Sequence, residues 1–348
     1  MLKKLLPYRL LLLTVLLAMP ALQLAFAQSS QQAPPAQSQP SQDDQKPTET
    51  LKVNVNVVQL FFNVKDKHGA LIPNLTKTDF DIAEDGKPQT IKYFTAESNL
   101  PLTLGIMIDS SGSQRNVIDM EKEVGGAFLK QILTDKDEAF VISFDITVDL
   151  LQDFTRDTHR LQAALNKAKI NVDYSSGGIP GMGGGPVPQT GNSPGTLLYD
   201  AVYLSAHDML AKEVGRKAMI LLTDGQDEGS RLKIQDAIEA AQKADAIVYV
   251  LLCADRGFYG AFGGYSGESE MRKLTEATGG RVINVGNKFD KLREAFDQIA
   301  AELRSQYNIG YTPTNTKKDG SYRKIELKNK QGYKIQARAG YYAGKEQD

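Results

Sequence analysis

An acid and two hydroxyls stand at alternating positions directly after an apolar run in the middle of the chain. They are Asp109, Ser111 and Ser113, within the run Asp-Ser-Ser-Gly-Ser. One carboxylate with two hydroxyls forms a set of hard oxygen donors, which suits Mg²⁺, Mn²⁺ or Ca²⁺ better than zinc. Asp and Ser after a strand also cap helices, so this run alone leaves helix capping open.

Two later segments also place side chains with oxygen donors at the ends of expected elements. Thr196 opens an expected helix, and Asp224 follows the apolar run 218–222 within the sequence Thr-Asp-Gly. In sheets built from alternating strands and helices, ligands bind at the carboxyl ends of the strands. If the strands before Asp109 and Asp224 are neighbours, we expect one cation to be surrounded by Asp109, Ser111, Ser113, Thr196 and Asp224.

The elements that must position these residues alternate between strand and helix. Apolar runs predict strands at 102–108, 139–144, 147–154, 218–222, 247–252 and 281–285. Helical spacing predicts helices at 117–132, 158–169, 197–212, 234–243, 268–278 and 289–304. This alternation predicts an α/β fold, with a doubly wound, mostly parallel sheet covered by helices on both faces.

Both ends of the chain have a different texture, with alternating apolar and polar residues typical of half-buried strands. Strands are predicted at 60–66, 80–83, 90–94, 307–311, 322–328 and 333–339, with a hairpin turn at 84–87. Each set is too small to stand alone. We therefore expect 51–98 and 305–345 to form one β-sandwich-like region into which 99–304 is inserted. The alternative is two separate β-appendages.

The first 27 residues have the features of an export signal. A basic start is followed by a leucine-rich stretch at 10–17, and Ala25-Phe26-Ala27 predicts cleavage after Ala27. An uncleaved membrane anchor is the alternative. Residues 28–50 are rich in Gln, Ser and Pro, which predicts a disordered linker. The chain is thus expected to be secreted or periplasmic, and to meet a membrane only if the signal is retained.

Composition excludes several classes of protein. The 348 residues carry a net charge of −1 and no basic run, so nucleic acid is not an expected partner. The single cysteine, Cys253, excludes an intrachain disulfide or a cysteine-based zinc site, and we expect it to be a buried, inert thiol. The three histidines are scattered without metal-binding spacing.

Together the three motif pieces resemble the von Willebrand factor type A domain and its metal-ion-dependent adhesion site. They are Asp-x-Ser-x-Ser at 109–113, Gly-Thr at 195–196 and Thr-Asp-Gly at 223–225. The resemblance implies that Ser111, Ser113 and Thr196 bind the cation directly. It also implies that Asp109 and Asp224 act mostly through water, leaving a position for a partner's carboxylate.

The whole chain also resembles a group of bacterial secreted type A-related proteins described from acidobacteria. The elements that carry this weaker resemblance are Asp79-Phe80, 85–89, 310–313 and 337–342.

Two loops precede or follow these motifs. The stretch 174–195 is rich in Gly and Pro and directly precedes Thr196; it is either a tolerated insertion or a flap beside the metal. The stretch 256–267 carries four aromatic residues among glycines. We expect partner binding by Phe258, Tyr259, Phe262 and Tyr265, with packing onto the body of the domain as the alternative.

The sequence therefore predicts a secreted, Mg²⁺-dependent (or Mn²⁺- or Ca²⁺-dependent) protein-binding module for adhesion or interaction, with no reaction catalysed. Its partner would be a protein that presents Asp or Glu. One alternative is a metal-assisted hydrolase, which would lack an evident general base near its serines. The other is an accessory or scaffold subunit with a vestigial metal site.

Overall fold

The computed structural model describes residues 57–97, 100–170, 195–253 and 267–345. These belong to one unit, Asn54–Asp348. The expected export signal (1–27), the linker (28–50), the glycine-rich loop before Gly195 and the four aromatic residues of the second loop lie outside the described residues.

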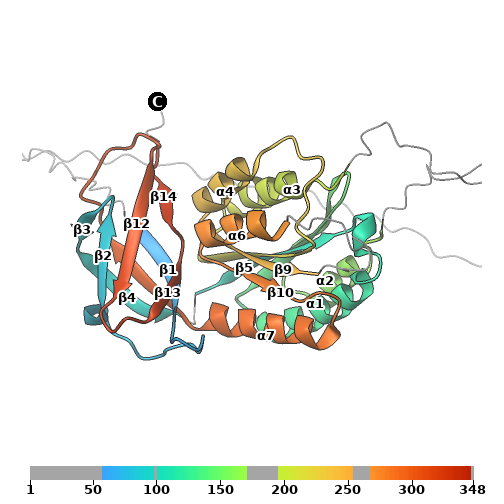
Figure 1. The fold of residues 1–348 in the computed structure, drawn as a ribbon, viewed down its shortest axis with the longest axis horizontal. Coiled ribbons are helices and arrows are strands. Elements are labelled where there is room, and N and C mark those ends of the chain that lie inside the picture. Colours follow the sequence, from blue (N-terminus) through green and yellow to red (C-terminus); the bar gives the residue numbers. More distant parts are fainter. Residues whose placement is uncertain (1–56, 98–99, 171–194, 254–266, 346–348) are drawn as a thin grey trace, which may run out of the picture. The chain divides into compact units, whose positions relative to one another are not determined.

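A six-stranded sheet forms the centre of the unit (Figure 1). Its strand order is β10-β9-β8-β5-β6-β7, and every neighbouring pair is parallel except β6 with β7. The strands are β5 (Leu102–Asp109), β6 (Glu138–Phe144), β7 (Val148–Thr155), β8 (Arg216–Thr223), β9 (Ala246–Leu252) and β10 (Val282–Asn284). Every residue of β5 and β8 is buried, as expected for parallel strands covered on both faces.

Helices cover both faces of this sheet (Figure 1). One face packs against α1 (Ile118–Ile132), α2 (Thr158–Leu165) and α7 (Phe289–Arg304). The other packs against α3 (Leu198–Leu204), α4 (Ile234–Lys243) and α6 (Gly267–Thr278). The predicted mostly parallel α/β class is thus confirmed.

Two of the predicted helices are shorter than expected. The helix predicted at 158–169 ends at Leu165, where the amides of Lys167 and Ala168 make tighter turn bonds instead. The helix predicted at 197–212 is α-helical only to Leu204, and a π-helical stretch, Ser205–Leu210, continues it.

Strands from both ends of the chain pair to form two four-stranded sheets. Their orders are β13-β1-β11-β4 and β14-β12-β2-β3. The strands are β1 (Val58–Lys65), β2 (Phe80–Glu84), β3 (Lys87–Gln89), β4 (Ile91–Glu97), β11 (Gln306–Tyr311), β12 (Tyr322–Asn329), β13 (Lys334–Ala337) and β14 (Gly340–Tyr342). The antiparallel pairs β1 with β11 and β2 with β12 join the two ends of the chain. The expected β-region built from both ends is therefore present.

Aromatic packing between the two sheets fills the interior of this β-region. The ring of Phe62 on β1 lies 5.2 Å from that of Phe80 on β2 and 5.5 Å from that of Tyr307 on β11. Each sheet thus buries aromatic rings of the other. The burial of this apolar surface is the main stabilising contribution in such an interior.

The hairpin in this region differs in part from the sequence prediction. The turn at 84–87 is present, but β2 pairs with the short β3, whereas β4 pairs with β11 in the other sheet. Pro88 lacks a backbone N–H, which suits β3 to the edge of its sheet. The chain leaves that edge after Gln89 and enters the second sheet at Ile91.

One buried carboxylate ties the β-region to the α/β part. Glu302, near the end of α7, accepts hydrogen bonds from Lys65 Nζ on β1 at 2.7 Å and from Arg281 Nε at 2.8 Å. Gln336 on β13 donates to its second carboxylate oxygen at 3.1 Å, and Asn63 donates to its backbone oxygen at 2.8 Å. Burial raises the pKa of Glu302, but the charges of Arg281 and Lys65 outweigh it and hold the pKa below its usual value.

Among the described residues, no helix is long and apolar enough to cross a membrane.

Replacing Glu302 should weaken the joint between the two parts. We expect Glu302→Gln to lower the free energy of unfolding by about 2–4 kcal/mol at neutral pH, because Lys65 and Arg281 lose a buried counter-charge. The lowered pKa means that the ion pair stabilises the fold above the unfolded-state pKa and is lost as the pH falls through the lower folded-state value.

Urea unfolding at about pH 7 and about pH 3.5 would measure this effect, and the difference between wild type and variant should shrink at the lower pH. Glu294→Gln, on an exposed position of α7, is the matched control. Equal loss of stability in both variants would contradict the prediction.

Candidate metal centre

The strands that carry Asp109 and Asp224 are neighbours in the central sheet. β5 pairs with β8 in parallel, and Ile108 lies beside Leu222. Asp109 is therefore level with Thr223, and Asp224 follows one residue later. The adjacency that a shared cation site requires of these two strands is therefore present.

Asp109 is fully buried and both of its carboxylate oxygens are bound. Oδ1 accepts a hydrogen bond from the Ser111 amide at 2.9 Å, and Oδ2 accepts one from Thr223 Oγ1 at 2.6 Å. Burial, together with the nearby charge of Asp224, raises the pKa of Asp109 to about 7. A carboxylate kept in this position is costly to ionise unless a positive charge accompanies it.

Ser111 and Ser113 present their hydroxyls together. Their Oγ atoms lie 3.0 Å apart, and both side chains are only partly buried. Ser111 directly precedes a short 3-10 helix, Gly112–Gln114, which contains Ser113 and precedes α1. The Ser111 amide also binds Asp109. The oxygen atoms of Asp109, Ser111 and Ser113 therefore lie in one hydrogen-bonded group.

Backbone hydrogen bonds fix the position of Thr196. Its carbonyl oxygen accepts from the Glu228 amide at 3.1 Å, and the next amide, that of Leu197, donates to the Asp145 carbonyl oxygen at 2.7 Å. A side chain at Gly195 would meet Glu228 Cβ at 2.2 Å, so only glycine allows this close approach. Thr196 is therefore held between the loop after β8 and the turn after β6.

Asp224 lies at the start of a sharp turn. Its Oδ1 accepts from the Gln226 amide at 3.0 Å, and the intervening Gly225 has a φ of +81°, which favours glycine. Asp224 itself is almost wholly buried. The turn thus aims a second carboxylate at the same sheet edge as Asp109.

The structure brings three of the five predicted ligands together by hydrogen bonds: the Ser111 amide donates to Asp109, and the hydroxyls of Ser111 and Ser113 bind each other. Asp224 lies near enough for its charge to raise the pKa of Asp109. Thr196 is held by backbone bonds to residues other than these four. The four aromatic residues Phe258, Tyr259, Phe262 and Tyr265 lie outside the described residues.

Sequence reasoning missed several residues that shape the site. Thr223 binds Asp109, and Asp145 accepts from Ser110 Oγ at 3.0 Å as well as from the Leu197 amide. Asp227, in the loop after β8, accepts from the Tyr199 amide at 3.1 Å and from Ser230 Oγ. The signal available for Thr223 was its place in the Thr-Asp-Gly run at a strand end.

A third carboxyl group lies behind the site. Glu121 on α1 is fully buried, and burial raises its pKa to about 8, with Asp109 and Asp224 adding to the rise and the Cys253 thiol opposing it. Cys253 is also fully buried, and burial raises the pKa of its thiol well above the usual value. The description of this cysteine as a buried thiol is confirmed.

No protein-family profile and no curated protein matches the chain. Its fold is similar to that of several solved structures. The conserved hypothetical protein BatB from Bacteroides thetaiotaomicron is 16% identical, with 59% of this chain and all of that chain covered and a TM-score of 0.42. A von Willebrand factor type A protein from Catenulispora acidiphila is 15% identical, covering 78% of this chain and 74% of that one, with a TM-score of 0.44.

Proximal thread matrix protein 1 from the mussel byssus, solved with a zinc-occupied metal-ion-dependent adhesion site, is a further similar structure. It is 14% identical, covering 62% of this chain and 48% of that one, with a TM-score of 0.45. The chain thus spans about half the length of the mussel protein.

The donor set fits a hard divalent cation. It offers hydroxyl and carboxylate oxygens and two neighbouring acids whose charges repel. In the part of the chain that the structure describes, no group of three or more His, Cys, Asp or Glu side chains could hold a metal by itself. A cation here would depend on the hydroxyls, which is consistent with Mg²⁺ rather than a soft metal.

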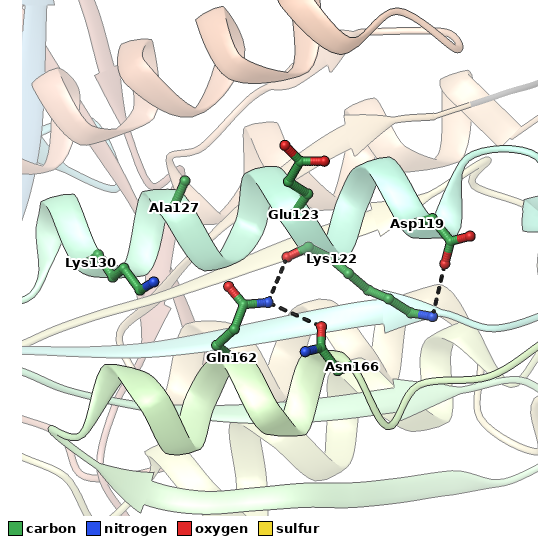
Figure 2. A pocket seen from close by; sticks show the side chains of 7 residues that line it. All are labelled: Asp119, Lys122, Glu123, Ala127, Lys130, Gln162 and Asn166. Carbon is green, nitrogen blue, oxygen red and sulfur yellow. Dashed lines mark hydrogen bonds and ion pairs between the residues drawn. The ribbon is translucent and has the colours of Figure 1, made fainter.

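A surface pocket of about 500 Å³ lies elsewhere, between α1 and α2 (Figure 2). Its polar groups bind one another: Gln162 Nε2 donates to the Lys122 carbonyl and to Asn166, and Lys122 pairs with Asp119. None of its lining residues belongs to the predicted metal set, so the pocket is not part of this site.

Removing the charge of Asp224 should stabilise the metal-free protein. At about pH 8 in EDTA, we expect Asp224→Asn to raise the free energy of unfolding by about 1 kcal/mol, because repulsion with Asp109 is relieved while the amide oxygen can still accept from Gln226. Added Mg²⁺ should then stabilise the wild type more than the variant.

Thermal melts with EDTA and with Mg²⁺ would test this. Asp119→Asn, an acid with 93% of its side chain exposed, is the control and should respond to neither condition. A lower melting temperature of Asp224→Asn in EDTA would show that the two acids do not repel.

Proposed function

We propose that this protein is an exported, metal-dependent protein-binding module. One observation carries the proposal: two neighbouring strands bring Asp109 and Asp224 to one edge of the sheet, next to the paired hydroxyls of Ser111 and Ser113. In the manner of the metal-ion-dependent adhesion site that these motifs resemble, Ser111, Ser113 and Thr196 would hold Mg²⁺. Asp109 and Asp224 would act through bound water.

When bound, the cation supplies a coordination position that a carboxylate of a partner protein can fill. The chain's own residues do the rest. The buried acids Asp109 and Asp224 would supply negative charge, and the partly exposed residues Ser111 and Ser113 would supply hydroxyl oxygens. The partner we propose is therefore a protein that presents Asp or Glu.

A binding role fits the site better than catalysis. No histidine lies in the three motif pieces, and the one acid that the Ser111 side chain approaches, Asp109, already accepts hydrogen bonds at both of its carboxylate oxygens. A metal-assisted hydrolase is the second candidate function, because the hydroxyls of Ser111 and Ser113 are partly exposed. The predicted signal at 1–27 supports export to the periplasm or beyond.

Partner capture with and without the metal would test the function. The chain from Gln28 onward, immobilised, should capture exported proteins in Mg²⁺ and lose them in EDTA. Asp109→Ala should lose the same proteins, because it removes a carboxylate of the site, whereas Asp119→Ala should retain them. Calorimetry should show Mg²⁺ or Mn²⁺ binding to wild type and to Asp119→Ala but not to Asp109→Ala.

The capture must also depend on a carboxylate of the partner. Replacing its Asp and Glu residues by Asn and Gln, one at a time, should identify one substitution that abolishes binding. Capture that is equal in Mg²⁺ and EDTA would favour the accessory-subunit alternative. Turnover of ester, peptide or phosphate substrates would favour the hydrolase.

The aromatic loop should contribute much of the affinity for the partner. Replacing Phe258, Tyr259, Phe262 and Tyr265 together by serine should weaken partner capture strongly and leave Mg²⁺ affinity unchanged, since aromatic anchors often cost about 2 kcal/mol or more when truncated. The measurement is capture at matched thermal stability. A large fall in melting temperature would instead show that the rings pack onto the body of the domain.

A further inference from the structure

Thr223 ends β8 and is completely buried. It was not among the predicted ligands. It binds both Asp109 and the turn that carries Asp224. Its hydroxyl donates to Asp109 Oδ2 at 2.6 Å and accepts from the Gly225 amide at 3.0 Å. A threonine hydroxyl has one proton and two lone pairs, so it can donate to the Asp109 carboxylate and accept from the Gly225 amide at the same time.

The bond to Asp109 fixes that carboxylate. The distance of 2.6 Å is in the range of a strong hydroxyl-to-carboxylate hydrogen bond. The other oxygen is fixed by the Ser111 amide at 2.9 Å. With one donor on each oxygen, the plane of the carboxylate is set before any cation arrives.

The bond from Gly225 fixes the second carboxylate indirectly. Asp224 lies between Thr223, whose carbonyl oxygen accepts from the Cys253 amide at 2.9 Å, and Gly225, whose amide is held by the Thr223 hydroxyl. On the far side, backbone atoms of Gly267 on α6 crowd Gly225, because a side chain at Gly267 would meet the Gly225 oxygen at 2.5 Å. The turn that aims Asp224 therefore has little freedom once the hydroxyl is in place.

We propose that Thr223 is the positioning residue of the cation site, and that its hydroxyl sets the separation of Asp109 and Asp224 in the metal-free protein. This inference rests on the proposed function. Groups that orient the ligands of a metal typically change affinity by about 10–100-fold when they are removed. The hydroxyl, and not the methyl group, carries this role.

Two variants separate the hydroxyl from the side-chain volume. Thr223→Val keeps the shape and removes the hydroxyl, and Thr223→Ser keeps the hydroxyl and removes the methyl group. By calorimetry with Mn²⁺ and with Mg²⁺ on the full chain, we expect Thr223→Val to bind at least about tenfold more weakly and Thr223→Ser to stay within about threefold of wild type.

A buried threonine at the opposite edge of the sheet provides the control. Thr103 lies near the start of β5, at the amino ends of the strands, and it is also buried. Thr103→Val should leave the affinity for Mn²⁺ and Mg²⁺ unchanged whatever it does to the melting temperature. If Thr223→Val does not fold, Thr223→Ser and Thr223→Ala give the same comparison.

Amide hydrogen exchange in EDTA gives a second reading that needs no metal. In Thr223→Val, the amide of Gly225 loses its acceptor, so exchange in the segment 223–226 should be faster than in wild type. Thr223→Ser and Thr103→Val should exchange in this segment as the wild type does.

The outcomes distinguish this inference from the function on which it rests. If wild type binds neither Mn²⁺ nor Mg²⁺, the proposed function and the positioning role both fall. If wild type binds and Thr223→Val binds equally well, or if Thr223→Ser loses as much affinity as Thr223→Val, the hydroxyl is not the positioning group and only the inference falls.

Discussion

The burial of Asp109 beside Asp224 is the constraint that governs the rest of the site. Two acids removed from water and placed near each other raise the free energy of the folded chain unless donors or a cation compensate. The structure supplies the donors one by one: the Ser111 amide, the Thr223 hydroxyl and the Gln226 amide. These groups orient the carboxylates, but they add no full positive charge, which is what a divalent cation would provide.

Three loops and one turn are held together around this pair of acids. The turn after β6 contributes Asp145, which binds the Ser110 hydroxyl through its side chain and the Leu197 amide through its backbone. The loop after β8 returns to Thr196 through the Glu228 amide. Because each segment is bound to another, the oxygen atoms are arranged by the whole edge of the sheet and not by any one loop. Such pre-arrangement lowers the cost of binding, since little has to be ordered when the ligand arrives.

The β-region contacts the α/β part at the edge of the central sheet opposite the candidate site. The α/β part joins it before Leu102 and after Arg304, at the amino ends of the strands, and Glu302 binds Lys65 and Gln336 there. The candidate site lies at the carboxyl ends of β5 and β8. Contacts with the β-region thus leave the hydroxyls of Ser111 and Ser113 partly exposed.

By itself the sequence predicted most of the strands and helices and the five candidate ligands, because the apolar periodicity and the position of each polar residue after a strand are local features. Three features depend instead on long-range packing. They are the sheet order that makes β5 and β8 neighbours, the pairing of strands from the two ends of the chain, and the placement of β3 and β4 in different sheets. The role of Thr223 likewise depends on tertiary structure. Its hydroxyl finds Asp109, 114 positions away in the chain, only because two parallel strands end side by side.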